Sequence, residues 1–204
     1  MKDIYVVISA TKSKIGKCIR LLTNNSYNHV SISFDDDLKD MISFARYYHE
    51  IPFYGGYIHE SMERYEDSNI ILYKVRVTNE DYQRVVNAVE EFEENASDYL
   101  YHTINAVLCP FNKEVYIERA YTCLSFATCL LANSSLKLPT IYNIKQLMRY
   151  LEPFKVYEGT IKNYFLHSNP SYLQNFSMSE RFIRTYSHQM KLVSRLIKKR
   201  SLKI

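Results

Sequence analysis

Short segments of alternating or unbroken apolar residues stand in the first part of the chain and predict strands. Four segments show this pattern: Ile4–Ile8, His29–Phe34, Met41–Tyr47 and Ile70–Val77. In the second segment, apolar and polar residues alternate, as they do in a strand with one face in the core. We therefore predict that these four segments are strands of a sheet.

Helical spacing of apolar residues marks further segments and predicts helices. These segments are Lys12–Leu22, Thr78–Glu94, Tyr99–Cys109, Thr122–Leu131, Asn143–Leu151 and Ser177–Ile197. Thr78, Thr122 and Ser177 can each cap a helix, because a side-chain oxygen in that position accepts a hydrogen bond from a backbone N–H of the first turn. Thr78 and Ser177 are followed three residues later by a carboxylate, close to the pattern of a capping box.

Two stretches between the predicted strands are expected to be irregular. Arg46–Gly56 is rich in tyrosine and ends in two glycines, which predicts a long aromatic loop. Gly55–His59 continues it as a loop that could fold back over a site. Asp35–Asp37 lacks the spaced aspartates of a calcium loop and is predicted to be a solvated turn.

Composition indicates a folded chain with no membrane span and no disulfide framework. The chain has 204 residues, 14% of them aromatic, and only 4 glycines, so it can bury a sizeable core. Met1-Lys2-Asp3 passes directly into the first predicted strand, so we expect no signal peptide and a cytoplasmic location. None of the 4 cysteines forms a Cys-x-x-Cys pair. We therefore expect reduced thiols, and neither a metal nor an organic cofactor.

Cys123 is the first candidate for chemistry. If Thr122 caps the helix, Cys123 lies in its first turn, where free N–H groups and the helix dipole favour a thiolate over a thiol. Leu124, Ala127 and Leu130 form an apolar stripe that would bury the helix and hold its first residue still. The alternative is that Cys123 only fills space in the core, as buried free cysteines often do.

His29 is the candidate base for such a thiol. It stands where a predicted strand begins, behind a polar loop, and from there it could reach the start of a helix packed across the strand. The alternative is an ordinary surface histidine, one of 6 in the chain.

Three stretches together resemble a known superfamily. They are Asn28–Ser33, Met41–Arg46 and Tyr121–Phe126. Their order and contexts are similar to the circularly permuted branch of the NlpC/P60 (papain-like) superfamily, which includes YiiX-like and lecithin–retinol-acyltransferase-like enzymes. The resemblance implies an α+β fold in which a small antiparallel sheet packs against the cysteine-bearing helix. We assign residues 1–160 to this domain and residues 161–204, which the resemblance does not cover, to a C-terminal extension with a basic amphipathic helix.

The resemblance also implies a third catalytic residue that orients the histidine. Relatives place Glu, Asn, Gln or His there, whereas the aligned position in this chain is Ser43. A serine hydroxyl carries no charge and stabilises an imidazolium less than a carboxylate does. Glu60 is the second candidate for this role.

The activity implied by the resemblance is that of a thiol hydrolase or acyltransferase acting on an amide, ester or thioester bond. Cys123 would attack the carbonyl, His29 would transfer the proton, and Ser43 or Glu60 would orient the ring. The substrate would be a peptide, a cell-wall-like compound or a lipid acyl group. The alternative is a catalytically silent binding module of the same fold, recruited to a membrane or a nucleic acid by its basic tail.

The positive charge of the chain is concentrated in its last residues. Residues 179–204 carry eight Lys or Arg and one Glu, a net of +7 against +4 for the whole chain, which leaves −3 for residues 1–178. A basic amphipathic helix suits an anionic membrane surface or an acidic partner, and we favour a nucleic acid less. The alternative is a helix that packs its apolar side on the body and displays lysines for solubility.

Overall fold

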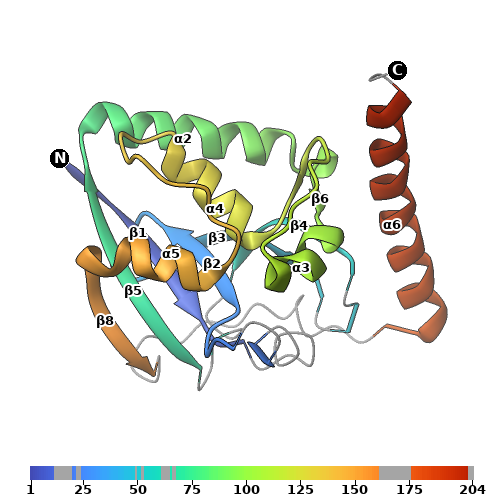
Figure 1. Ribbon diagram of the computed structural model, residues 1–204, viewed down its shortest axis with the longest axis horizontal. Coiled ribbons are helices and arrows are strands. Elements are labelled where there is room, and N and C mark those ends of the chain that lie inside the picture. The colour runs from blue at the N-terminus through green and yellow to red at the C-terminus, as the bar shows by residue number, and fades with distance from the viewer. Residues whose placement is uncertain are drawn as a thin grey trace.

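The structure is a computed structural model that describes residues 1–11, 20–21, 24–48, 50–51, 53–60, 65, 68–160 and 176–201. It has an α+β architecture with an antiparallel sheet and a long C-terminal helix, in agreement with the class predicted from the sequence (Figure 1). Most of the predicted helix Lys12–Leu22, including Cys18, lies outside the described residues.

A six-stranded sheet forms the centre of the molecule, in the order β4-β3-β2-β1-β5-β8. All neighbouring strands pair antiparallel. The strands are β1 (Lys2–Ser9), β2 (His29–Ser33), β3 (Met41–Arg46), β4 (Gly55–Glu60), β5 (Asn69–Val77) and β8 (Lys155–Thr160). The four predicted strands are confirmed as β1, β2, β3 and β5.

The sheet is covered on both faces, which explains the unbroken apolar runs of its central strands. Ile4, Val6 and Ile8 of β1 lie in the main core with residues of α2 (Asn79–Glu94), α4 (Cys123–Ala132) and α5 (Ile144–Leu151), helices that Figure 1 shows on one side of the sheet. Tyr5 and Val7 face the other way and belong to a smaller cluster with Met41 and Tyr65.

The helix caps follow the sequence signals. The Thr78 hydroxyl accepts from the N–H of Asp81 at the start of α2, and the Thr122 hydroxyl accepts from the N–H of Ser125 at the start of α4. At the start of α4 the two residues form a capping box, because the Ser125 hydroxyl in turn accepts a hydrogen bond from the N–H of Thr122 at 2.9 Å. These bonds fix the first turn of α4, and with it the position of Cys123.

The prediction of a loop over Gly55–His59 is wrong, because these residues form β4 with Glu60. Arg46 pairs with Gly55 and Met41 pairs with Glu60, so β3 and β4 form a hairpin. Gly55 packs directly against the backbone of Ala45, where a Cβ atom would collide with the carbonyl oxygen. The glycine is therefore needed for close approach within a strand and not for a mobile lid.

Two further elements differ from the sequence prediction. The single helix expected over Tyr99–Cys109 is instead a short strand followed by a helix: β6 (Leu100–Tyr101) pairs in parallel with β7 (Ala120–Tyr121), and α3 spans Thr103–Leu108. The His102 ring caps α3, because its Nδ1 accepts from the N–H of Asn105. Strand β8 was not predicted, because its largely exposed sequence has no apolar alternation.

The C-terminal helix α6 (Met178–Ser201) stands beside the body next to α3 and β6 (Figure 1). The predicted capping box is present: the Ser177 hydroxyl accepts from the N–H of Glu180, whose carboxylate accepts from the N–H of Ser177. None of the described helices is both long enough and apolar enough to cross a membrane.

His188 anchors α6 to the body, and its burial predicts how the stability of the folded protein changes in acid. Its ring is 3% exposed, Nε2 donates to the Tyr101 carbonyl, and burial lowers its pKa below the usual 6.5. An unfolded chain therefore takes up this proton before the folded chain does, so stability is lost as the pH falls below about 6.5. We expect urea unfolding between about pH 6.5 and 5.5 to show a loss of stability that His188→Gln reduces. An unchanged slope in the variant would contradict this role.

Candidate active site

The first residues of β2 and α4 bring the two main candidates together. His29 is the first residue of β2 and Cys123 is the first residue of α4, and both are buried, at 7% and 8% exposed. The thiol lies close enough to the imidazole to hydrogen-bond with it and to interact with its charge. The structure therefore places a thiol at a capped helix N-terminus beside a buried imidazole.

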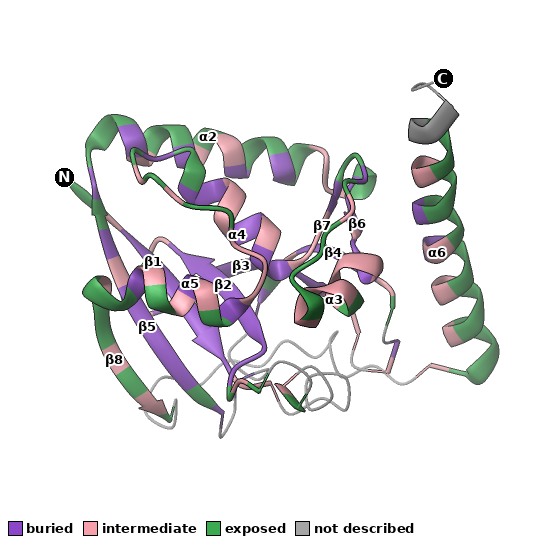
Figure 2. Ribbon diagram, viewed as in Figure 1, coloured by how far each residue is buried: buried purple, intermediate pink, exposed green. Residues whose placement is uncertain are grey.

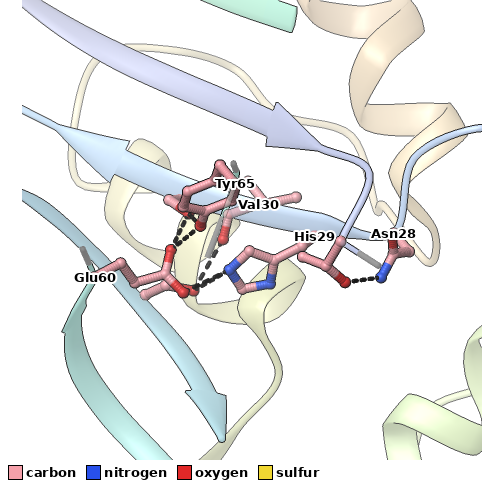
Figure 3. A network of polar contacts seen from close by, with 8 residues as sticks. Asn28, His29, Val30, Glu60 and Tyr65 are labelled. Carbon is pink, nitrogen blue, oxygen red and sulfur yellow. Dashed lines mark hydrogen bonds and ion pairs between the residues drawn. The ribbon is translucent and has the colours of Figure 1, made fainter. Parts of the chain in front are cut away.

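Glu60 is the strongest partner of His29. The last residue of β4 places its carboxylate so that His29 Nε2 donates to Oε1 over 2.8 Å, with the carboxylate fully buried (Figure 3). Because Nε2 is engaged by Glu60, the other ring nitrogen, Nδ1, is the one left for the Cys123 thiol. The imidazole can therefore link the carboxylate and the thiol.

Ser43 also lies at the site, but in a secondary position. Its Oγ is 3.4 Å from His29 Nε2, and its hydroxyl donates to the Val30 carbonyl at 2.9 Å. It can offer a lone pair to a protonated ring, yet it is further away than Glu60 and carries no charge. Of the two candidates for orienting His29, the geometry favours Glu60.

Two hydroxyl groups that the sequence analysis did not single out hold the Glu60 carboxylate. Ser31 and Tyr65 both donate to Oε2, and their own oxygens lie 2.8 Å apart. Both side chains are fully buried, and the Tyr65 ring stacks near the His29 ring at 6.2 Å between centroids. Ser31 carries a sequence signal, as the polar residue two positions after His29 on the same strand, whereas Tyr65 reaches the site only through the fold.

The charges around His29 decide its protonation state. Burial alone would lower the pKa of His29, but the negative charge of Glu60, followed by the charge and hydrogen bond of Cys123, raises that pKa to about 10. The ring is therefore an imidazolium at neutral pH, with a proton to donate from each nitrogen. Such a group can donate a hydrogen bond to a neighbouring sulfur atom.

A pocket opens in front of Cys123. It encloses about 610 Å³ of empty space, counted out to its open mouth. Its walls come from the start of α4, from α3 and the 3-10 turn after it, and from the segment before α5, with Tyr101, Cys109, Lys113, Ile141 and Tyr142 among the lining residues. The mixed apolar and polar wall would admit an acyl compound to the sulfur.

The other described cysteines lack this environment. Burial raises the pKa of Cys109 to about 11, with the nearby Cys123 adding to the effect, and burial also raises the pKa of Cys129. Neither is placed at the start of a helix beside an imidazolium. Within the described ranges, no group of three or more His, Cys, Asp or Glu side chains is arranged to hold a metal ion.

No family model, no curated protein and no solved structure gave a significant match. The interpretation of this site therefore depends on its geometry and chemistry.

Proposed function

We propose that this protein is a cysteine-dependent hydrolase or acyltransferase with a circularly permuted papain-like fold. The observation that carries the proposal is the buried chain of Glu60, His29 and Cys123, with Cys123 at the capped N-terminus of a helix and open to a pocket. Hydrogen-bonded carboxylate, imidazole and thiol groups in this order are the arrangement that activates a sulfur nucleophile.

The proposed reaction proceeds through an acyl-enzyme. The Cys123 thiolate attacks the carbonyl carbon of an amide, ester or thioester, and the carbonyl oxygen becomes an oxyanion. The backbone N–H of Cys123, at the start of α4, can donate to that oxyanion. His29 gives its proton to the leaving group, then accepts one from the water or acceptor that releases the acyl group.

Glu60 has the role of orienting residue in this scheme. It holds the ring so that Nδ1 faces Cys123, and its charge stabilises the imidazolium that exists before attack and forms again during deacylation. Ser31 and Tyr65 fix the carboxylate in turn. The proposal assigns Ser43 a minor role, because its hydroxyl is committed to the Val30 carbonyl.

Alkylation by iodoacetamide, resolved by mass spectrometry for each cysteine, tests the proposed thiolate. At about pH 6 we expect Cys123 to react while Cys109 and Cys129 do not, and we expect His29→Ala to slow Cys123 on the order of a hundredfold, since an ordinary thiol is almost fully protonated there. His59→Ala is the matched control, because His59 also pairs with carboxylates but lies on the surface.

The same proteins incubated with p-nitrophenyl acetate test the acylation step. Acetyl transfer to Cys123 should occur in the wild type and the His59 variant, and should be lost in the His29 variant and in Cys123→Ala. If Cys123 is unreactive at mildly acidic pH, or reacts equally well without His29, the proposed dyad does not exist.

A further inference from the structure

The side of helix α6 that faces the body is mostly polar and basic, although Leu192 and Leu196 on it pack in a small apolar cluster with the body. Arg181 pairs with Glu50, the Gln189 amide donates to the Phe53 carbonyl, and the Arg195 guanidinium donates to the Asp98 carbonyl at 2.8 Å. The Arg184 guanidinium lies over the rings of Tyr48, Tyr54 and Phe176. Together with the buried Leu192 and His188, these contacts fix which face of α6 is covered.

The apolar face of the same helix points away from the body. Seven large apolar side chains are between 41% and 78% exposed: Met178, Phe182, Ile183, Tyr186, Met190, Val193 and Ile197. Their spacing of mostly three or four residues places them along one stripe of the helix. Figure 2 shows α6 largely exposed along its length. Leu192 and Leu196 pack in an apolar cluster with the body, but these seven side chains do not, so most of the apolar side of α6 is not packed on the body.

The charge of α6 indicates what covers this stripe. The helix contains seven Lys or Arg residues and a single acid, Glu180. Arg181, Arg184 and Arg195 contact the body, whereas Lys191 and Lys198 are exposed to solvent. A second copy of the chain would bring two such helices, and therefore two sets of positive charges, together. A surface that carries negative charge over an apolar interior matches both the positive charge of α6 and its exposed apolar stripe.

We propose that α6 binds an anionic lipid membrane, lying in the plane of the interface with its apolar stripe among the acyl chains. At 1.5 Å per residue, its 24 residues span about 36 Å, so the whole stripe can enter in one orientation. Lys191 and Lys198 are exposed, and their long side chains can reach phosphate groups at the edge of the stripe. The proposal holds whether or not Cys123 is catalytic.

Flotation of the full chain with vesicles tests the proposal. We expect binding to vesicles of phosphatidylcholine and phosphatidylglycerol in equal amounts, and little binding to phosphatidylcholine alone. Replacing Phe182, Ile183 and Tyr186 together by glutamine should weaken binding at least about tenfold, because three large apolar groups no longer leave water. Lys191→Gln with Lys198→Gln should weaken it on the order of fivefold per charge at low salt.

Three exposed apolar residues elsewhere provide a matched control. Val107, Phe111 and Tyr116 are each 64% exposed and lie outside α6, so replacing them by glutamine should leave vesicle binding unchanged. Circular dichroism of each variant checks that the helix content is kept. Equal loss of binding in this control would overturn the assignment to α6.

Two other outcomes would also overturn the proposal. If light scattering shows a dimer that the α6 glutamine variant converts to a monomer, and the wild type does not float, a second copy covers the stripe. If the protein binds RNA or DNA in a filter assay but no vesicle, and only the lysine variant loses that binding, the partner is a nucleic acid.

Discussion

Glu60→Gln is expected to lower the free energy of unfolding by about 3 kcal/mol and to remove the reactivity of Cys123 at mildly acidic pH. Glutamine has nearly the size of glutamate and can still accept from His29 Nε2, so neither a cavity nor a misplaced ring explains the loss. What disappears is the charge that contributes most to keeping His29 protonated. Without it, burial favours the neutral imidazole, and the ring no longer holds a thiolate.

The pH dependence of this effect has a definite sign. The folded pKa of His29 is raised, so the stability that its ion pair contributes is fully present below the unfolded pKa of about 6.5 and is lost as the pH rises through about 10. The stability gap between wild type and Glu60→Gln should therefore be largest at mildly acidic pH and should narrow as the solution becomes alkaline. Chemical denaturation at several pH values measures this gap.

Glu93→Gln is the matched control for Glu60→Gln. Glu93 pairs with the His59 ring at 3.1 Å, but both side chains are about half exposed, at 42% and 53%. A pair at the surface contributes at most about 1 kcal/mol, so we expect a small effect on stability and none on Cys123 alkylation.

Ser43→Ala in the same assays separates the two candidates for the orienting role. If Ser43→Ala abolishes the reactivity and Glu60→Gln leaves it intact, the assignment of Glu60 is wrong.

Local sequence patterns were sufficient to predict the two elements that carry His29 and Cys123. The alternation around Val30 and Ile32 defines β2, and the Thr122 cap defines the start of α4, because both depend on neighbouring residues. These two signals point to His29 and Cys123 as the candidate residues. That the two side chains lie side by side is a property of the fold, and no sequence spacing shows it.

The parts that could not be predicted depend on pairing between distant segments. Strand β4 begins with two glycines, which have low strand propensity, and it forms because β3 supplies a complete antiparallel partner. Tyr65 reaches Glu60 because of that hairpin and of the cluster it joins beneath the sheet. The orientation of helix α6 could not be predicted for the same reason. Its amphipathic pattern fits an apolar face turned either toward the body or away from it, and contacts such as that of Arg181 with Glu50 select the second orientation.

Phe44→Ala is expected to cost about 4 kcal/mol of stability, the largest effect that we predict for a residue outside the candidate site. Phe44 lies on β3, is fully buried, and is in ring contact with Phe126 of α4 at 5.1 Å and Tyr121 of β7 at 5.3 Å. Its ring therefore helps to hold the sheet against the helix that begins with Cys123. Alanine would leave a cavity at this junction, which the surrounding rigid rings cannot close.

The comparison of Phe44→Ala with Glu60→Gln separates packing from the proposed chemistry. Phe111→Ala is the control for truncating a phenylalanine, because that side chain is 64% exposed and its loss should cost less than about 0.5 kcal/mol. Phe44 packs among apolar and aromatic side chains, whereas the Glu60 carboxylate is held by His29, Ser31 and Tyr65. Folded Phe44→Ala protein should therefore keep the alkylation of Cys123 at mildly acidic pH, whereas Glu60→Gln loses both stability and reactivity. If Phe44→Ala is as stable as Phe111→Ala, the sheet and α4 do not meet as described.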